Sequence, residues 1–203
     1  MRIGGIVLCG GRSTRMGTAK AWLPIGNETM LGRTVRVIRE VVFPVVVVAA
    51  VDQEVPPLPH DIAILRDEVS LCGPLSGLAT GMAALAGQVD AIYLSACDLP
   101  KLDRETVHQL LQAFSPAAPV AVAQSERGLH PLTAVYALSL LPRIRERLNE
   151  GKLRMLDLIE SIPYQAVAIA DARSLVNLNT MREYREYLSS TEPDQAGVTD
   201  QSA

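Results

Sequence analysis

The sequence predicts an α/β protein with a mostly parallel central sheet. Apolar runs of strand length alternate with segments of helical periodicity along most of the 203 residues, which is typical of this class. One run, VVVVAAV at residues 45–51, is apolar without a break, as expected for a parallel strand buried on both faces. Hydrophobic residues make up 48% of the chain and charged residues 20%, so a chain of this length can bury a full core.

In the N-terminal half, the predicted elements follow from apolar spacing. A short apolar stretch at residues 6–8 ends in a glycine pair and is predicted as the first strand. Residues 30–41 carry apolar side chains at helical spacing, and Pro44 stops that helix before strand 45–51. These elements are followed by a weaker strand at 62–65 and a helix of small residues at 75–85.

In the C-terminal half, the apolar run 91–96 is predicted as another buried strand, and it ends at Cys97 and Asp98. Asp103 is suited to the N-cap of a helix at 104–114. The same two periodicities predict strands at 120–123, 132–136 and 164–169 and helices at 138–148, 154–159 and 181–188.

A single domain is predicted over residues 1–188. The apolar periodicity disappears from Ser189 onward, and the remaining segment 189–203, SSTEPDQAGVTDQSA, is polar with small residues and a proline. Such a segment buries too little apolar surface to fold, so we predict a disordered C-terminal tail.

The bulk properties argue against several classes of protein. A net charge of −3 gives no general attraction to nucleic acid or to an anionic membrane. No apolar run approaches the roughly 20 residues of a membrane-spanning helix, and the N-terminal apolar stretch is too short and glycine-rich for a secretory signal. Cys9, Cys72 and Cys97 lie far apart without a CxxC spacing, so neither a disulfide framework nor a zinc site is expected. We therefore predict a reduced, cytoplasmic protein.

The stretch LCGGRSTRMGTAK at residues 8–20 places two glycines and three cations directly after the first predicted strand. Ligands of open α/β sheets bind beyond the carboxyl ends of the strands. At Gly10 and Gly11 the backbone can approach a ligand closely, and its N–H groups can hold phosphate oxygens. Arg15 and Lys20 supply positive charge within reach of the same phosphates.

Two named phosphate-binding motifs do not fit this stretch. The pattern GxGxxG would need glycines where Arg12 and Arg15 stand, and the pattern GxxxxGK[ST] fails because Gly17 is followed by Thr18 rather than lysine. The loop therefore belongs to another kind of phosphate site, and a solvated turn is the alternative.

Acidic residues follow two other predicted strands. Asp98, in ACDLP at 96–100, comes directly after strand 91–96 and projects toward the same edge as the glycine pair. Mg²⁺ is held by one or two carboxylates with phosphate oxygens and water, so Asp98 suits a metal-dependent reaction of polyphosphates, whereas a helix cap or loop aspartate is the alternative. Asp67 precedes GPLSG at 73–77, where a helix N-terminus offers free N–H groups. Close helix packing is the alternative use of these glycines.

The segments LCGGRSTRMG, a following lysine, GPLSG, CDLP and VNLNT, in this order, make the sequence resemble the molybdenum cofactor guanylyltransferases. The resemblance covers about residues 4–188. At this position these enzymes typically have the sequence LAGG, whereas the related molybdopterin cytidylyltransferases have LAAG. The LCGG of this chain resembles the guanylyltransferase motif. The resemblance implies a three-layer, Rossmann-like nucleotidyltransferase fold.

The reaction that the resemblance implies uses GTP, molybdopterin bearing molybdenum, and Mg²⁺. The terminal phosphate of the pterin attacks the α-phosphorus of GTP, which forms the guanine dinucleotide of the cofactor and releases pyrophosphate. Proteins that mature molybdoenzymes are the implied downstream partners, whereas neither nucleic acid nor a membrane is expected to be a partner. No nucleophilic serine or cysteine is needed, because the attacking phosphate is already anionic and the protein mainly positions charge.

On the GTP side, the resemblance implies three charged catalytic residues. Arg15 and Lys20 would neutralise the triphosphate and the departing pyrophosphate, and Asp98 would bind Mg²⁺. The other implied contacts to GTP come from Leu8, Gly10, Gly11 and Asp67.

On the molybdopterin side, the resemblance implies Asn177 and Asn179, which form the NxN segment near the C-terminus. His130, in the loop after Gly128, matches a segment that faces the second substrate, and a plain surface loop is the alternative for it.

The sequence departs from the family pattern at two places and leaves two alternatives open. Ala19 stands before the loop lysine where the family usually carries an aspartate, and Val48 and Ala50 occupy a region where some members have an asparagine. The choice of base is therefore open: a related enzyme using CTP or another nucleotide, with molybdopterin or another phosphorylated metabolite, is one alternative. A catalytically inactive nucleotide-binding protein is an alternative from another class.

Overall fold

A seven-stranded sheet forms the centre of the computed structural model, which describes residues 1–10, 19–67 and 73–191. Its strands are β1 (Ile3–Cys9), β4 (Val45–Ala50), β5 (Ala63–Asp67), β6 (Ala91–Ala96), β7 (Val120–Ser125), β8 (Gly128–Ala137) and β9 (Gln165–Ala168). They lie in the order β5-β4-β1-β6-β8-β7-β9, and only the two pairings of β8 are antiparallel. The predicted α/β class with a mostly parallel sheet is confirmed.

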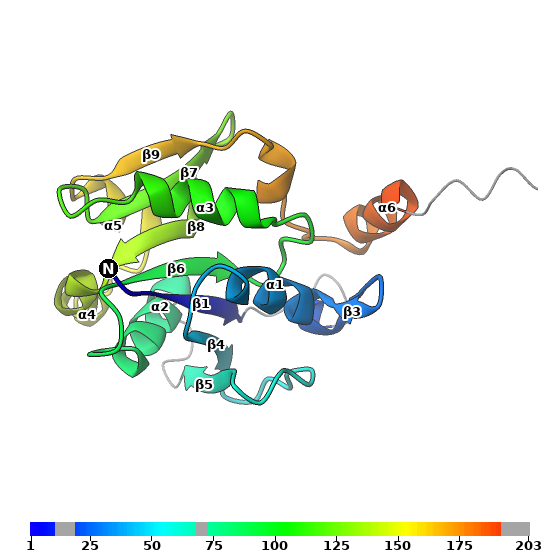
Figure 1. The fold of residues 1–203 in the computed structure, drawn as a ribbon. Helices are drawn as coiled ribbons and strands as arrows, with labels where there is room; N and C mark the ends of the chain where they lie inside the picture. The colour runs from blue at the N-terminus through cyan, green and yellow to red at the C-terminus, as the bar shows by residue number, and fades with distance from the viewer. Residues whose placement is uncertain (11–18, 68–72, 192–203) are drawn as a thin grey trace, which may run out of the picture.

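Helices cover both faces of this sheet and complete three layers (Figure 1). They are α1 (Met30–Arg39) and α3 (Arg104–Ala113) on one face, and α2 (Gly73–Ala84), α4 (Leu141–Asn149) and α5 (Met155–Glu160) on the other. Successive side chains of a strand point to opposite faces, so neighbouring residues of β1 belong to different cores. Val7 packs under α1 and α3, whereas Ile6 packs under α2, and both are fully buried.

Two glycines allow α2 to pack closely on β1. A Cβ atom at Gly77 would lie 2.9 Å from the side chain of Leu8, and one at Gly81 would lie 2.6 Å from the side chain of Ile6. Real Cβ atoms essentially never come so close, so a larger residue at either position would displace the Leu8 or the Ile6 side chain. The second glycine of GPLSG therefore has a packing role in α2.

A small additional unit stands beyond the carboxyl ends of β1 and β6, on the side to which their arrows point in Figure 1. It contains the 3₁₀ turn η1 (Lys20–Trp22), the hairpin of β2 (Pro24–Ile25) and β3 (Glu28–Thr29), and the last helix α6 (Met181–Thr191). Leu178 and Tyr184 share a third apolar cluster with Leu23, Ile25 and Met30. The Tyr184 hydroxyl also donates to the Pro24 carbonyl at 2.7 Å, so the C-terminal segment is docked on the segment that follows β1.

The structure differs from the sequence-based prediction mainly in the lengths of elements. β8 begins at Gly128 rather than at residue 132, and α6 continues to Thr191, past the domain boundary predicted at residue 188. The hairpin of β2 and β3 escapes prediction because each strand has two residues, which is too short for a recognisable alternation. The predicted N-cap of α3 is confirmed, since the Asp103 carboxylate accepts the Thr106 N–H at 2.8 Å.

Two further 3₁₀ turns connect later elements of the chain. The turn η2 (Leu138–Leu140) lies between β8 and α4, and η3 (Ala172–Leu175) lies between β9 and α6. None of the helices in the described parts of the chain combines the length and the apolar character that a bilayer crossing needs.

Candidate functional site

The carboxyl ends of the central parallel strands bring several predicted site residues to one edge of the sheet. Gly10 follows β1, Asp98 lies two residues after the end of β6, and Asp67 ends β5. β1 lies between β4 and β6, so Gly10 stands between the carboxyl ends of these two strands. A Cβ atom built at Gly10 would find no atom within 4 Å, so open space lies beside this backbone.

Lys20 and Asp98 form an ion pair at this edge. The Lys20 Nζ atom lies 2.7 Å from Asp98 Oδ2, and the two side chains are only 19% and 13% exposed. Turn η1 positions the lysine, because its next residue, Ala21, is buried against the core. A charge pair so far removed from water interacts more strongly than one on the surface.

The C-terminal segment adds two asparagines to this pair. The Asn177 Nδ2 atom donates to Asp98 Oδ1 at 3.0 Å, and Lys20 Nζ donates to Asn179 Oδ1 at 3.0 Å. The backbone of the same segment is also attached, because the Leu178 N–H donates to the Asp98 carbonyl at 3.1 Å. We call Lys20, Asp98, Asn177 and Asn179 the polar cluster.

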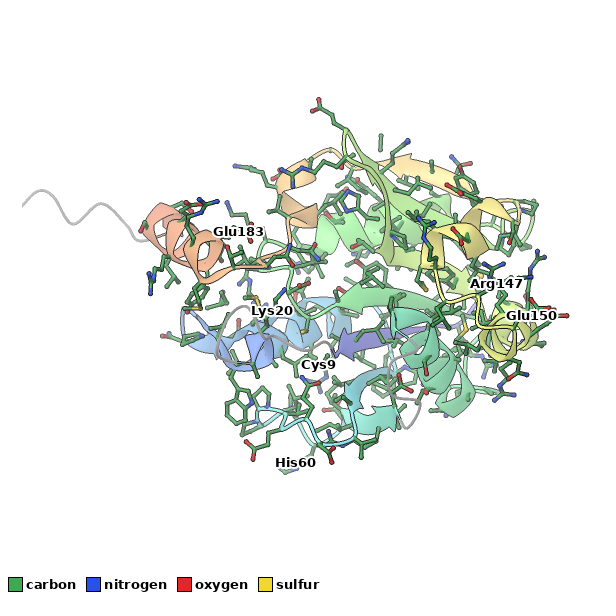
Figure 2. All side chains as sticks on the ribbon, turned by 180° about the vertical axis from the view of Figure 1, so that it is seen from behind. Cys9, Lys20, His60, Arg147, Glu150 and Glu183 are labelled. Atoms are coloured by element: carbon green, nitrogen blue, oxygen red, sulfur yellow. The ribbon has the colours of Figure 1, made fainter. Side chains whose placement is uncertain are left out.

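Glu183 holds the C-terminal part of the polar cluster in place. Its carboxylate accepts the backbone N–H groups of Asn179 at 2.6 Å and of Thr180 at 3.1 Å, and the Thr180 hydroxyl accepts the Glu183 N–H at 3.2 Å. This reciprocal arrangement is a capping box at the start of α6. The hydrogen bonds from Asn179 and Thr180 lower the pKa of Glu183, so its charged form is favoured. Figure 2 shows Glu183 and Lys20 at the same end of the molecule.

Leu8 and Asp67 lie at the edge with partners of their own. The Leu8 side chain is buried under α2, and its carbonyl accepts the Cys97 N–H at 3.1 Å. The Ser76 hydroxyl, near the start of α2, donates to Asp67 Oδ1 at 2.7 Å. Gly11 and Arg15, the other two residues predicted for the GTP side, fall outside the described residues.

His130 is the member of the predicted set with a different neighbourhood. It lies on β8, and its Nε2 atom is 2.7 Å from the Ser125 hydroxyl of β7. Burial, with a smaller contribution from the charge of Arg127, lowers the pKa of His130 and favours its neutral form. In the described structure its side-chain hydrogen bond runs to β7, whereas the members of the polar cluster bind one another.

Sequence reasoning missed two residues at this edge. Glu183 could have been found, because Thr180 and Glu183 have the T-x-x-E spacing of a capping box before an amphipathic helix. Gln53 follows β4 and donates from Nε2 to the Cys9 sulfur at 3.2 Å, but only the strand order brings it there. Of the two positions that depart from the family pattern in this strand, Val48 is buried in the core and Ala50 is exposed at its end.

The donor set at this edge fits a hard divalent cation that is shared with phosphate. Groups of three or more His, Cys, Asp and Glu side chains arranged for a metal are absent from the described residues. Asp98 nevertheless offers two carboxylate oxygens, each of which accepts one hydrogen bond and keeps a further lone pair. Mg²⁺ commonly takes one or two carboxylates and fills its remaining positions with phosphate oxygens and water.

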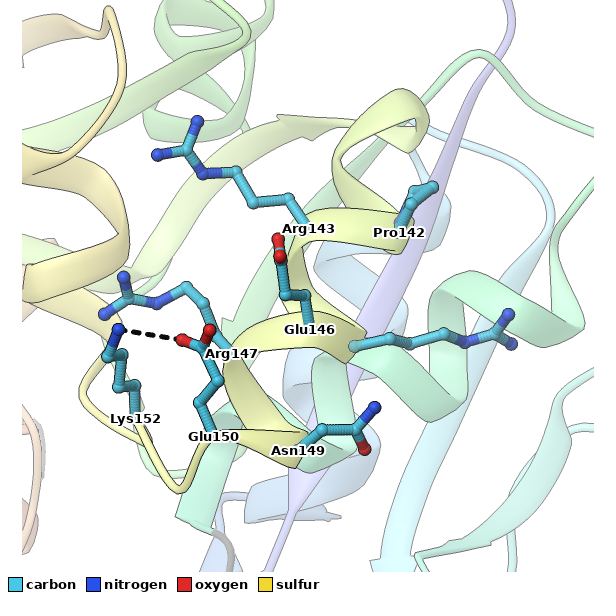
Figure 3. Close-up of a pocket in the computed structure, with 8 residues that line it drawn as sticks. Pro142, Arg143, Glu146, Arg147, Asn149, Glu150 and Lys152 are labelled. Atoms are coloured by element: carbon cyan, nitrogen blue, oxygen red, sulfur yellow. Dashed lines mark ion pairs between the residues drawn. The ribbon is translucent and has the colours of Figure 1, made fainter.

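A hollow lies at the opposite end of the molecule, along α4 (Figure 3). Figure 2 shows Arg147 and Glu150 of this hollow far from Lys20. Its charged residues belong to one short stretch of chain, and Lys152 pairs with Glu150 at 2.8 Å. The residues that line it are Pro142, Arg143, Arg145, Glu146, Arg147, Asn149, Glu150 and Lys152.

Comparison with known proteins identifies relatives over most of the chain. The family model of the "MobA-like NTP transferase domain" matches residues 5–163. The "Probable molybdenum cofactor guanylyltransferase" of Mycobacterium tuberculosis H37Rv is 34% identical over 182 residues, which cover 88% of this chain and 89% of that protein. This similarity covers more of the chain than the matched model does.

Two solved structures show the same fold at low sequence identity. Molybdopterin-guanine dinucleotide biosynthesis protein A from Archaeoglobus fulgidus superposes with a TM-score of 0.73 at 17% identity, covering 93% of this chain and 100% of that one. An M. tuberculosis H37Rv protein in complex with manganese superposes with a TM-score of 0.67 at 20% identity, covering 94% of this chain and 100% of that one.

Proposed function

We propose that this chain, which belongs to the MobA-like NTP transferase family, transfers GMP from GTP to molybdopterin. Its membership in this family makes it an enzyme of the nucleotidyltransferase type. The acceptor is the terminal phosphate of molybdopterin bearing molybdenum, and the products are the guanine dinucleotide of the cofactor and pyrophosphate. The observation that carries the proposal is the polar cluster at the carboxyl edge of the sheet, in a chain 34% identical to a protein named as a guanylyltransferase.

The chemistry requires little more than positioning and charge. An oxygen of the pterin phosphate attacks the α-phosphorus of GTP, a new P–O bond forms, and the bond to the departing pyrophosphate breaks. Negative charge then increases on the pyrophosphate, so fixed cations beside it stabilise the transition state. The nucleophile is already ionised, and a strong general base is not needed.

Lys20 is suited to this task without leaving Asp98. A lysine ammonium has three N–H donors, and in the described structure Lys20 directs two of them to Asp98 and Asn179. The third has no partner among the described residues and can bind a phosphate oxygen. We propose that Arg15 adds a second cation to the triphosphate, and that the backbone of Leu8, Gly10 and Gly11 contacts the nucleotide.

We assign Asp98 as the metal ligand and the two asparagines to the acceptor side. Asp98 would hold Mg²⁺ with phosphate oxygens and water, and the ion would supply positive charge to the phosphates when bound. Asn177 and Asn179 keep amide atoms beyond those that contact Asp98 and Lys20, and we propose that these atoms orient molybdopterin. Asp67 lines the GTP site, and His130 is proposed to face the acceptor.

A pyrophosphate-release assay tests the proposal. Purified protein is given Mg²⁺ and molybdopterin bearing molybdenum, with GTP, CTP, ATP or UTP in parallel. We expect release with GTP that depends on the pterin. A larger rate with CTP would reassign the base, and no release with any nucleotide would favour the inactive nucleotide-binding alternative. Thermal unfolding adds a binding measurement, because a ligand at 100 times its Kd stabilises a protein by about 2.7 kcal/mol.

The domain boundaries and the cellular context belong to the same proposal. We propose that residues 1–188 form one domain that works in the cytoplasm and hands its product to maturation proteins of molybdoenzymes. Limited proteolysis tests the boundary: cleavage should remove the C-terminal segment and leave a fragment with unchanged pyrophosphate release.

A further inference from the structure

Cys9 and Cys97 face each other across the two central strands. In the parallel pairing of β1 with β6, Leu8 is opposite Ala96. The next residues along these two strands are Cys9 and Cys97, which are therefore also opposite each other. The Cys97 N–H donates to the Leu8 carbonyl at 3.1 Å and continues the ladder past the end of β6. Both side chains belong to the core under α1 and α3. Figure 2 shows Cys9 near the centre of the molecule.

The separation of the two backbones suits a covalent link. Neighbouring strands lie about 4.7–4.9 Å apart, and disulfides join Cα atoms about 4.4–6.8 Å apart. Both cysteines are free in the structure. Cys9 and Cys97 are 88 positions apart in the chain, so no spacing rule reveals that they lie close together.

The surroundings of Cys9 favour its reactive form. The hydrogen bond from Cys97 lowers the pKa of Cys9, and Gln53 and the charge of Arg66 act in the same direction against the opposing effect of burial. The thiolate is the nucleophilic form of cysteine. Cys9 is fully buried and Cys97 is 8% exposed, so only a small reagent can reach the pair, and slowly.

We propose that Cys9 and Cys97 are a redox-active dithiol, which hydrogen peroxide converts to a disulfide between β1 and β6. One thiolate attacks a peroxide oxygen, the O–O bond breaks, and the departing hydroxide takes up a proton to become water. The sulfenic acid so formed is attacked by the second sulfur, which has lost its proton. The S–S bond forms, the S–O bond breaks, and a second water leaves. Two thiols are oxidised by two electrons and one peroxide is reduced to two waters.

This link would act directly on the candidate site. Cys9 precedes Gly10, and Cys97 precedes Asp98, so a bond between the sulfurs constrains the two backbones that flank the open space. Because the protein interior is closely packed, neighbouring residues have little freedom to adjust to such a constraint. The disulfide therefore switches the enzyme off, and reduction restores it. The inference concerns the thiols alone and does not depend on which nucleotide or acceptor the enzyme uses.

Mass spectrometry of the full chain tests the proposal. Reduced protein is treated with hydrogen peroxide, and the intact mass and a non-reducing peptide map are recorded. We expect the loss of two hydrogen atoms and one peptide pair joined through Cys9 and Cys97. The Cys72→Ala variant should behave in the same way, whereas Cys9→Ala should form no intramolecular link. Recovery of Cys9 and Cys97 as separate peptides, or a link from either to Cys72, overturns the proposal.

Activity gives the second measurement. Pyrophosphate release of the wild type should fall at least tenfold as the disulfide forms and return with dithiothreitol. The Cys9→Ala variant, compared with its own untreated sample, should keep most of its rate after the same exposure. A disulfide that forms fully without loss of rate overturns the switch. If the untreated enzyme releases no pyrophosphate, the proposed reaction is wrong. The mass measurement still shows whether Cys9 and Cys97 form a disulfide.

Discussion

The two ends of the molecule both present charged side chains, but they are organised in different ways. At the carboxyl edge, Lys20, Asp98, Asn177 and Asn179 bind one another across separations of 78, 79 and 159 residues. Along α4, the charges come from a single short stretch, and the pair of Lys152 and Glu150 is 59% and 45% exposed. The first arrangement needs the whole fold, whereas the second needs one helix and the residues after it.

This difference teaches where function should be sought. Exposed ion pairs are screened by water and contribute little to stability or binding. Charges that the fold removes from water and fixes against each other are already oriented when a ligand arrives, which is the condition for strong electrostatic catalysis. The hollow along α4 is surrounded by more charged residues than the polar cluster contains, yet its side chains are held mainly by local contacts.

The largest effect is expected from Asp98→Asn, which keeps the shape of the side chain and removes its charge. If Asp98 holds the metal, kcat should fall by about 10³-fold or more. Removing one partner from a buried ion pair also costs about 3–5 kcal/mol of stability, and somewhat less for side chains that retain partial exposure. Steady-state kinetics must therefore be accompanied by an unfolding curve. A folded variant with near-normal turnover would show that Asp98 is not the metal ligand.

The next largest effect is expected from Lys20→Ala. Loss of one fixed cation beside the phosphates should reduce kcat by about 10²–10³-fold. Lys20→Arg serves as the matched control, since it keeps the charge but changes the donor geometry. If both variants lose the same activity, the donor geometry of Lys20 contributes more to turnover than its positive charge does. If neither loses activity, the polar cluster is structural and the contrast with the α4 hollow disappears.

A smaller effect is expected from Glu183→Ala. The carboxylate fixes the backbone at Asn179, so its loss should lower kcat/KM by about tenfold through misplacement of that side chain. Glu186→Ala on the same helix is the control, because Glu186 pairs only with exposed Arg182 in the described structure. Equal effects of the two variants would contradict a specific role for Glu183.

The pH dependence of Glu183 has a definite sign. Its pKa is lowered in the folded protein, so its contribution to the start of α6 is present above the pKa of the unfolded chain. That contribution is lost as the pH falls through the folded pKa, below the usual range of a glutamate. Amide hydrogen exchange at Asn179 and Thr180 in the wild type should therefore become faster as the pH falls through this range. In the Glu183→Gln variant, which has no carboxylate to titrate, the exchange should not show this acceleration.

The smallest effect is expected from Arg147→Ala in the α4 hollow. Turnover should change less than about twofold, because Arg147 lies far from the polar cluster (Figure 2). The same pyrophosphate assay used for Lys20→Ala checks this value. A loss comparable to that of Lys20→Ala would mean that the hollow takes part in the reaction, and the comparison of the two ends would have to be abandoned.

Local patterns carried much of the fold. The unbroken apolar run at β4, the helical spacing of α1 and the cap of α3 each reflect the preference of a few adjacent residues, and such preferences can be read directly. The hairpin of β2 and β3 could not be predicted from alternation, because each strand has only two residues. That Leu178 and Tyr184 pack against it is likewise a tertiary contact.

The sequence by itself determined the class of the fold, the family, and the identities of Lys20, Asp98, Asn177 and Asn179 as candidates, because each stands in a short motif whose chemistry is local. Only the tertiary structure decided which of them meet. The contacts of Asp98 with Lys20 and Asn177, the support from Glu183, and the facing thiols of Cys9 and Cys97 all depend on strand order and on the docking of α6. Partners so distant in the chain are specified by the packing of the whole domain, and no window of neighbouring residues contains that information.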